Sequence, residues 1–281
     1  MFLLIKNNSL TIVFGKSGIG KTSVLQAGLI PELQKKSFFP IYFRIDFAGA
    51  KPSLTQLKDF IYEKLKTKDQ TISEFDNRTL WEYFHDIKLS GGKVIPVLIL
   101  DQFEEIFTIG KDKSSEVTEL ITELSDMAEN RVPATVYAEY QKRDELLPSH
   151  YERQQYRVII GLREDYLAQL ESLKKYLPSI QKSRCRILQM TALQAMQSVL
   201  KSGGTLIEIP VAKDIIKKLP GITENNFDEL SDQSELRITE TLFRRDFKRI
   251  QINKSIFNED KCLSLIINWN GLLNTENLTQ P

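Results

Sequence analysis

The sequence predicts an α/β fold of three layers, in which a mostly parallel β-sheet lies between two layers of helices. Short apolar segments that suit buried strands alternate with longer segments of helical periodicity. The first of these strands leads directly into a glycine-rich turn, and a helical pattern follows the turn. A hydrophobic fraction of 41% in a chain of 281 residues is sufficient for a substantial core.

Five segments are expected to be strands, at residues 9–14, 40–47, 94–100, 157–162 and 186–190. The third is a continuous apolar run bounded by turn signals, which suits a strand buried on both faces. One strand separates the glycine-rich turn from this run, and another follows it. This order is typical of sheets with an additional strand beside the first one, so we expect the spatial order 5-1-4-3-2.

Helical patterns occupy the segments between these strands, at residues 21–36, 53–66, 116–129 and 167–176. In the first of them Pro31 predicts a break or a kink, because proline cannot continue the hydrogen-bond ladder of a helix. Residues 131–155 are polar and mixed, and their pattern predicts no element. Beyond Thr191 only helical patterns occur, so we expect a core at residues 1–192 and a helical lid region at residues 193–281.

The glycine-rich turn matches the phosphate-binding pattern GxxxxGK[ST] in full. Its glycines let backbone N–H groups surround phosphate groups, and the dipole of the following helix favours anions. Lys21 is expected to reach the β and γ phosphates, and the Thr22 hydroxyl to ligate Mg²⁺. The expected nucleotide-binding residues are Gly15, Lys16, Ser17, Gly18, Ile19, Gly20, Lys21, Thr22 and Ser23. An ordinary glycine-rich turn is the alternative, but a strand before the motif and a helix after it favour a P-loop.

The third strand ends in a group of acids. Asp101 directly follows the apolar run, where a Walker B aspartate would hold Mg²⁺. If the chain turns helical there, Glu104 and Glu105 return to the side of Asp101, and one of them could orient a water as general base. The alternative is a solvated acidic helix start, which the helix dipole favours.

Arg163 follows the fourth strand, at the edge where parallel strands line a ligand crevice. Its guanidinium could contact the γ-phosphate and so report whether that group is present. The alternative is a surface arginine that pairs with Glu164 or Asp165.

The composition restricts which binding partners and which cellular compartment we expect for the chain. The net charge of +1 provides no field that would steer the chain onto nucleic acid or an anionic membrane. The two cysteines lack a metal-binding pattern, and no run is long enough to cross a bilayer. A cytoplasmic setting is therefore expected. Asn253 and Lys254 look like a guanine-reading motif, but Ile256 stands where that motif needs an aspartate, which favours ATP over GTP.

Three segments together resemble the STAND class of signal-transduction NTPases, and most closely the bacterial novel STAND branch, which is related to NACHT and AAA+ ATPases. These segments are FGKSGIGKTSVLQAGLIPEL, LILDQFEEIFT and VIIGLREDYLAQL, and the resemblance covers about residues 9–200. It implies an ATP-dependent switch that assembles into a signalling oligomer in bacterial defence or regulation. It also implies that the chain is a truncated or partial member with an incomplete lid, since members carry further domains.

The resemblance assigns a role to each candidate residue. Lys21 and Thr22 correspond to the Walker A pair, Asp101 to the Mg²⁺ acid and Arg163 to the sensor-1 arginine. By comparison with NACHT proteins, Glu104 is favoured over Glu105 as the base. The partners implied are ATP and ADP, further copies of the chain or other domains of a larger switch.

Three other functions compete with a hydrolysing switch. A module that binds nucleotide with little or no hydrolysis is the first, and a turnover assay separates it from a switch. An ATPase that depends on nucleic acid is the second, and the charge balance disfavours it. A small-molecule kinase is the third, but the sequence lacks the arginine-rich lid that it would need.

Overall fold

The computed structural model describes residues 1–47, 49, 51–188, 194–196, 199–200 and 208–217. The sheet and its flanking helices form one compact unit made of Met1–Thr22 and Leu29–Ile187. The second unit consists of Ser23–Gly28 and Leu188–Pro281, and its described part includes the helix α10 (Ile209–Lys217). Of the expected lid region, residues 193, 197–198, 201–207 and 218–281 lie outside the described residues, as do the last two residues of the expected strand 186–190.

The sheet of the first unit has five strands among the described residues, and every pairing between them is parallel. Their bounds are β1 (Leu10–Gly15), β2 (Phe38–Arg44), β3 (Ile95–Asp101), β4 (Arg157–Arg163) and β5 (Arg184–Arg186). Their spatial order is β2-β3-β4-β1-β5, which confirms the expected order 5-1-4-3-2. Because the strands are parallel, the carboxyl ends of β1, β3 and β4 meet at one edge of the sheet.

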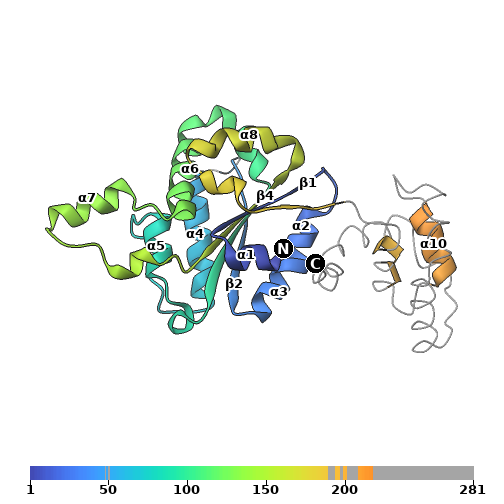
Figure 1. Cartoon of the computed structure of the whole chain (residues 1–281), viewed down its shortest axis with the longest axis horizontal. Coiled ribbons are helices and arrows are strands. Elements are labelled where there is room, and N and C mark those ends of the chain that lie inside the picture. Colours follow the sequence, from blue (N-terminus) through green and yellow to red (C-terminus); the bar gives the residue numbers. More distant parts are fainter. Residues whose placement is uncertain (48, 50, 189–193, 197–198, 201–207, 218–281) are drawn as a thin grey trace. The chain divides into compact units, whose positions relative to one another are not determined.

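Helices cover both faces of the sheet (Figure 1). One layer contains α4 (Ser53–Lys66), α5 (Leu80–Asp86), α6 (Ser114–Glu129) and α8 (Leu167–Ser172), and the other contains α1 (Phe2–Asn7) and α3 (Ile30–Lys35). The main core lies between the sheet and the first layer, where alternate strand residues such as Leu98, Leu100 and Ile160 meet the apolar stripes of α4 and α6. This arrangement confirms the predicted three-layer α/β class.

The helical segment after the glycine-rich turn is irregular at an unexpected place. It starts with α2 (Lys21–Ser23), continues as a π-helix over Val24–Leu29 and ends as α3. Pro31 lies in the first turn of α3, where the missing N–H of proline costs little. The regular helix is therefore interrupted next to Pro31, as predicted, but the irregular part is the run of wide π turns that ends at Leu29.

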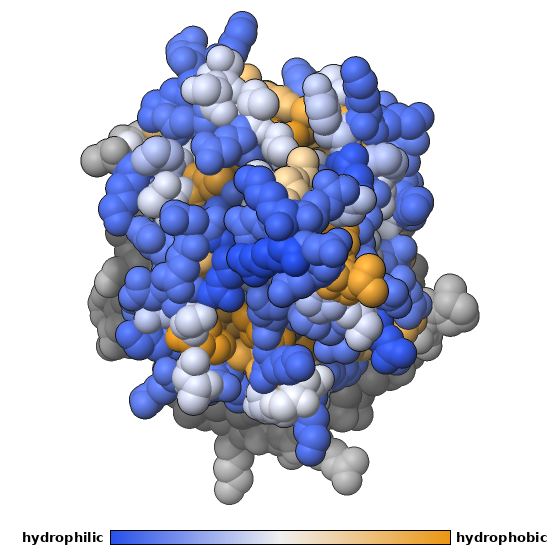
Figure 2. All heavy atoms as spheres, turned by 90° about the vertical axis from the view of Figure 1, so that its left-hand side faces the viewer, coloured by the Kyte–Doolittle hydropathy of each residue, from blue (hydrophilic) through white to orange (hydrophobic). Residues whose placement is uncertain are grey.

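Residues 131–155, for which the sequence predicted no element, contain α7 (Ala134–Lys142) and a single turn of 3₁₀-helix, Ser149–Glu152. In Figure 1, α7 extends away from the sheet. A small apolar cluster of Trp81, Val136 and Tyr151 joins this arm to α5. Hydrophilic side chains predominate on the face at this end of the molecule, and the apolar ones form separate patches (Figure 2).

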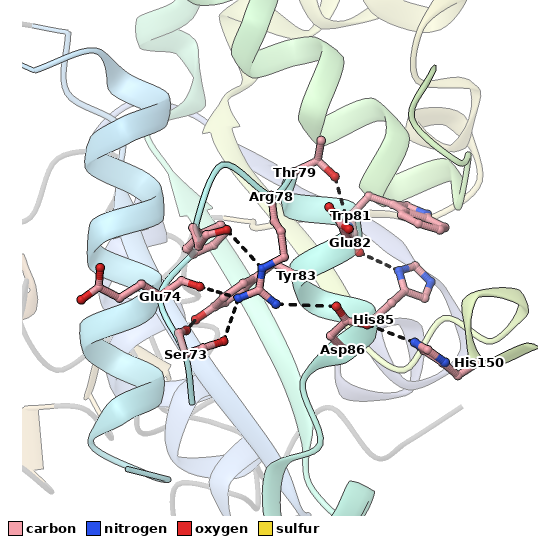
Figure 3. A network of polar contacts seen from close by, with 11 residues as sticks. Ser73, Glu74, Arg78, Thr79, Trp81, Glu82, Tyr83, His85, Asp86 and His150 are labelled. Atoms are coloured by element: carbon pink, nitrogen blue, oxygen red, sulfur yellow. Dashed lines mark hydrogen bonds and ion pairs between the residues drawn. The ribbon is translucent and has the colours of Figure 1, made fainter. Parts of the chain in front are cut away.

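A polar network holds α5 against the loop that precedes it and against the 3₁₀ turn after α7 (Figure 3). Arg78 is its centre: its Nε donates to the Phe75 carbonyl at 3.1 Å, and its Nη1 lies 3.6 Å from Oδ2 of Asp86. The other carboxylate oxygen of Asp86 lies 3.0 Å from Nε2 of the half-exposed His150. His85 is buried, with its Nδ1 2.7 Å from the Trp81 carbonyl. Both histidines thus have structural contacts distant in sequence from the glycine-rich turn.

Short 3₁₀-helices fill many of the remaining connections, at Leu89–Gly92, Phe103–Phe107, Ile109–Asp112, Glu164–Tyr166, Leu173–Lys175 and Pro178–Gln181. Two of them directly follow β3 and β4, and they determine where the acids and the arginine of the candidate site point. Among the described helices, none is long and apolar enough to cross a membrane.

Candidate functional site

The glycine-rich turn leaves β1 at Gly15 and closes at the start of α2. Gly15 has to be glycine, because a Cβ there would lie 2.8 Å from the Ile187 carbonyl oxygen and 3.2 Å from the Ile19 side chain. Gly18 and Gly20 have φ angles of +73° and +87°, which L side chains rarely adopt. Lys16, Ser17 and Gly18 are exposed, so the turn presents its backbone to solvent. The backbone thus has the open, left-handed geometry of an anion-binding cradle.

Lys21 points back over this cradle. Its Nζ donates to the carbonyl oxygens of Gly15 at 3.2 Å and of Lys16 at 3.1 Å. Burial lowers the pKa of Lys21, and the negative charges of Glu104 and Asp101 oppose that shift. The ammonium group therefore lies beside the cradle, partly desolvated and close to two carboxylates.

Thr22 and Asp101 connect the turn to the end of β3. The Thr22 hydroxyl donates to Oδ2 of Asp101 at 2.6 Å, and the Asp101 side chain is almost completely buried. The same oxygen accepts a hydrogen bond from the Tyr42 hydroxyl at 2.7 Å. The structure thus brings together the two residues that the sequence assigned to a metal ion, and adds a tyrosine from β2.

The chain turns sharply after Asp101, and this turn separates the two glutamates. Gln102 adopts a left-handed conformation with a φ of +57°, and its N–H donates to Oδ1 of Asp101 at 2.9 Å. A 3₁₀-helix over Phe103–Phe107 follows, rather than the α-helix on which the expected spacing depended. In such a helix neighbouring side chains point in directions about 120° apart. Glu104 and Glu105 therefore face different partners.

Glu104 faces the end of β4, where its Oε2 accepts the backbone N–H of Arg163 at 3.1 Å. Glu105 faces β2, where its Oε1 lies 3.2 Å from Nη2 of Arg44. Arg44 is the register partner of Asp101 across the β2–β3 pair. Glu104 thus lies between the strand ends that carry Asp101 and Arg163, whereas Glu105 is engaged by the edge strand.

Arg163 is the register partner of Gly15, because β4 pairs directly with β1. Its Nη2 lies 2.5 Å from Oδ2 of Asp165, and its guanidinium lies over the Tyr166 ring at 5.6 Å. Its Nε is buried and has no hydrogen-bond partner among the described residues. The backbone of Arg163 is therefore beside the glycine-rich turn, while its side chain adopts the pairing with Asp165 that the sequence offered as the alternative.

A second arginine fixes the same region from the other side of β1. Arg186 of β5 is the register partner of Phe14, and its Nη2 lies 2.5 Å from Oε1 of Glu164. This ion pair connects β5 to the turn after β4. The segment around Arg163 is thus held by two contacts: β4 pairs with β1, and Glu164 forms an ion pair with Arg186 of β5 on the other side of β1.

The residues present fit a nucleotide with Mg²⁺. A glycine-rich turn with Gly18 and Gly20 at positive φ lies next to an ammonium group, and a hydroxyl and a carboxylate meet 2.6 Å apart at its end. Oxygen ligands of this kind are those that Mg²⁺ prefers, and the metal usually bridges them to phosphate oxygens. Glu104 and Arg163 would supply a proton acceptor and a cation within the same group of strand ends.

Two residues of this region received no functional role from the sequence. Tyr42 and Arg44 lie in β2, outside the motifs that the sequence analysis singled out. Their alternation with apolar residues in YFR gave the one available signal, since residues two apart on a strand share a face. Which acids they would meet depends on strand order and on the turn at Gln102.

Comparisons with known proteins agree with this geometry. Residues 2–230 match the family described as novel STAND NTPase 1. A search of curated proteins found no match.

Among solved structures, the chain is similar to the Aeropyrum pernix ORC2 protein, solved as ADPNP–ADP complexes. The TM-score is 0.50 at 11% identity, over 98% of this chain and 65% of that chain. It also matches a chain of the HORMA:CdnC:Trip13 complex of E. coli MS115-1, with a TM-score of 0.39, 10% identity, and coverage of 93% and 74%. The chain thus spans less than two thirds of the length of the ORC2 chain, and that likeness concerns the fold.

Proposed function

We propose that this chain, which belongs to the novel STAND NTPase 1 family, binds ATP together with Mg²⁺ at the end of β1 and uses it as a slow, Mg²⁺-dependent ATPase switch. The observation that carries the proposal is the 2.6 Å hydrogen bond between Thr22 and Asp101. It joins the phosphate-binding turn to a buried acid at a neighbouring strand end. Few arrangements other than a Walker A and Walker B pair bring these groups together.

In the proposed complex, the backbone of residues 15–23 surrounds the phosphates and Lys21 neutralises part of their charge. Lys21 has to leave the Gly15 and Lys16 carbonyls for this, and phosphate oxygens offer it stronger, charge-assisted partners. Thr22 and Asp101 would hold Mg²⁺, which neutralises charge that develops on the phosphate oxygens. The sequence features at Asn253 and Ile256 favour ATP over GTP.

For hydrolysis, Glu104 is the proposed general base. It shares its surroundings with Lys21 and with the N–H of Arg163, so it lies among the groups that would contact the γ-phosphate. Glu105 is less suited to the role because it is paired with Arg44. Arg163 is the proposed sensor: a γ-phosphate would compete with Asp165 for its guanidinium.

At the level of the whole protein, we propose a STAND-type switch in bacterial defence or regulation, located in the cytoplasm. ATP and ADP would be its ligands, and further copies of the chain or other domains its partners. Residues 1–192 would form the core that binds the nucleotide and residues 193–281 part of the helical lid. The support for this level is the family, together with the position of Arg163 beside the cradle.

A nucleotide-binding module with little or no hydrolysis is the second candidate. The observation that favours it is the 2.5 Å pairing of Arg163 with Asp165, which engages the cation that hydrolysis would use. A turnover assay separates the two, because the module would bind ATP without releasing phosphate.

Mg²⁺-dependent binding of a fluorescent ATP analogue tests the proposal. Asp101→Asn should weaken binding with Mg²⁺ more than binding in EDTA, because it removes the charge that anchors the ion. Asp144→Asn, in the loop after α7, is the matched control and should change neither. Unlabelled ATP should displace the analogue better than GTP. Equal losses in Asp101→Asn with and without Mg²⁺ would remove the metal role from this residue.

A further inference from the structure

Tyr42 belongs to the edge strand β2, yet its hydroxyl reaches the centre of the candidate site. The register places Tyr42 opposite Ile99, so its ring extends along the strand direction to the end of β3. There the hydroxyl donates to Oδ2 of Asp101 at 2.7 Å. Nothing in the phosphate-binding or acidic motifs accounts for this tyrosine.

The Asp101 carboxylate is held by three donors. Its Oδ2 accepts the hydroxyls of Thr22 at 2.6 Å and Tyr42 at 2.7 Å, and its Oδ1 accepts the Gln102 N–H at 2.9 Å. The side chain is only 1% exposed, so these donors replace water as its hydrogen-bond partners. A buried carboxylate without such partners would lose much of the stabilisation of its charge.

We propose that Tyr42 is a positioning residue of the Mg²⁺ site, which holds Asp101 in the orientation that a metal ion requires. The proposal rests on the proposed function, since it presupposes that Asp101 serves Mg²⁺. Thr22 is itself a proposed metal ligand. Its hydrogen bond to Asp101 therefore has to adjust when the ion binds. Tyr42 is the side-chain donor that approaches Asp101 from outside the P-loop, and it can keep the carboxylate fixed throughout.

Counting lone pairs makes the role more specific. A carboxylate oxygen accepts about two hydrogen bonds, and Oδ2 already has two donors. Oδ1 accepts one hydrogen bond among the described residues, from the Gln102 N–H. Tyr42 thus occupies one acceptor position of Oδ2 and would limit rotation of the carboxylate, whichever of its oxygens meets the ion.

The test is a Mg²⁺ titration of fluorescent ATP analogue binding to the full chain and to Tyr42→Phe. Phenylalanine keeps the ring and removes only the hydroxyl. We expect the Mg²⁺ concentration at half-saturation to rise on the order of tenfold, the equivalent of one hydrogen bond to a charged group, while binding in EDTA stays unchanged. Tyr137→Phe, an exposed tyrosine on α7, is the matched control and should leave both measurements unchanged.

Two further variants separate the ways in which the proposal can fail. In the Asp101→Asn background the charge that Tyr42 holds is gone, so Tyr42→Phe should shift the Mg²⁺ midpoint less than about twofold. A shift of equal size in both backgrounds, equal losses with and without Mg²⁺, or no shift at all would overturn the positioning role. Lys21→Ala tests the proposed function separately: if it binds the analogue as tightly as the parent chain does, the nucleotide site and the role of Tyr42 are both wrong.

Discussion

Exchanging the two neighbouring glutamates after Asp101 for glutamine should give very different results. Glu104→Gln retains a carbonyl oxygen that can accept the Arg163 N–H, now at 3.1 Å, and it fills the same space. It loses the ability to accept a proton from water. Removal of a general base typically costs about 10²–10⁴ in rate, so ATP should stay bound while turnover falls by that factor.

Glu105→Gln removes an ion pair at the rim of the site instead. The Arg44 side chain is 62% exposed, and such pairs contribute about 0–1 kcal/mol. If all of this energy served the transition state, turnover would change by no more than about fivefold. The 3₁₀ turn is the reason for the difference, because it directs the two carboxylates to different strands.

Single-turnover hydrolysis with protein in excess over labelled ATP measures both variants without interference from product release. Titration with a fluorescent ATP analogue provides the control, since both should bind it as the parent chain does. Equal rate losses in the two variants, or a larger loss in Glu105→Gln, would refute the assignment of Glu104 as base.

Three other perturbations follow from the same contacts. Gly15→Ala should lower the free energy of unfolding by about 1–3 kcal/mol and weaken ATP binding, because its Cβ would meet the Ile187 carbonyl at 2.8 Å. Urea denaturation measures the loss of stability, and an unchanged denaturation midpoint would contradict the prediction. Arg163→Ala should lower the ratio of ATP to ADP affinity, since the proposed sensor responds to the charge of the γ-phosphate. An unchanged ratio would remove the sensor role. Burial lowers the pKa of His85, so the unfolded chain binds a proton at a higher pH than the folded chain does. Stability should therefore fall as the pH drops below about 6.5, and His85→Phe should lose part of that dependence in denaturation measured at several pH values.

Much of the fold could be predicted from periodicity and turn signals. Helix 53–66 was predicted with the bounds of α4, and the continuous apolar run at residues 94–100 became the buried strand β3. The strand order followed from where the glycine-rich turn and the acidic strand end lie along the chain. These features are local, and each depends on a few neighbouring residues.

The differences arise where tertiary packing overrides local pattern. Leu25, Leu29 and Leu33, spaced by four residues, do not reveal the π turns before Pro31, because a short run of wider turns changes the apolar spacing very little. The left-handed Gln102 is the other case: glutamine has no particular preference for that conformation, so the 3₁₀-helix that separates Glu104 from Glu105 could not be foreseen. The role of Tyr42 likewise needed the register of β2 against β3.

The proposed function requires that the phosphate cradle binds a nucleotide. Titration of the full chain with ATP and Mg²⁺ by isothermal calorimetry, beside Lys21→Ala, tests it most directly. The parent chain should bind one ATP, and the variant should show no measurable binding, because the phosphates lose the mobile cation of a cradle built from neutral amides. Equal affinity in the two proteins, or no binding by either, would contradict the account.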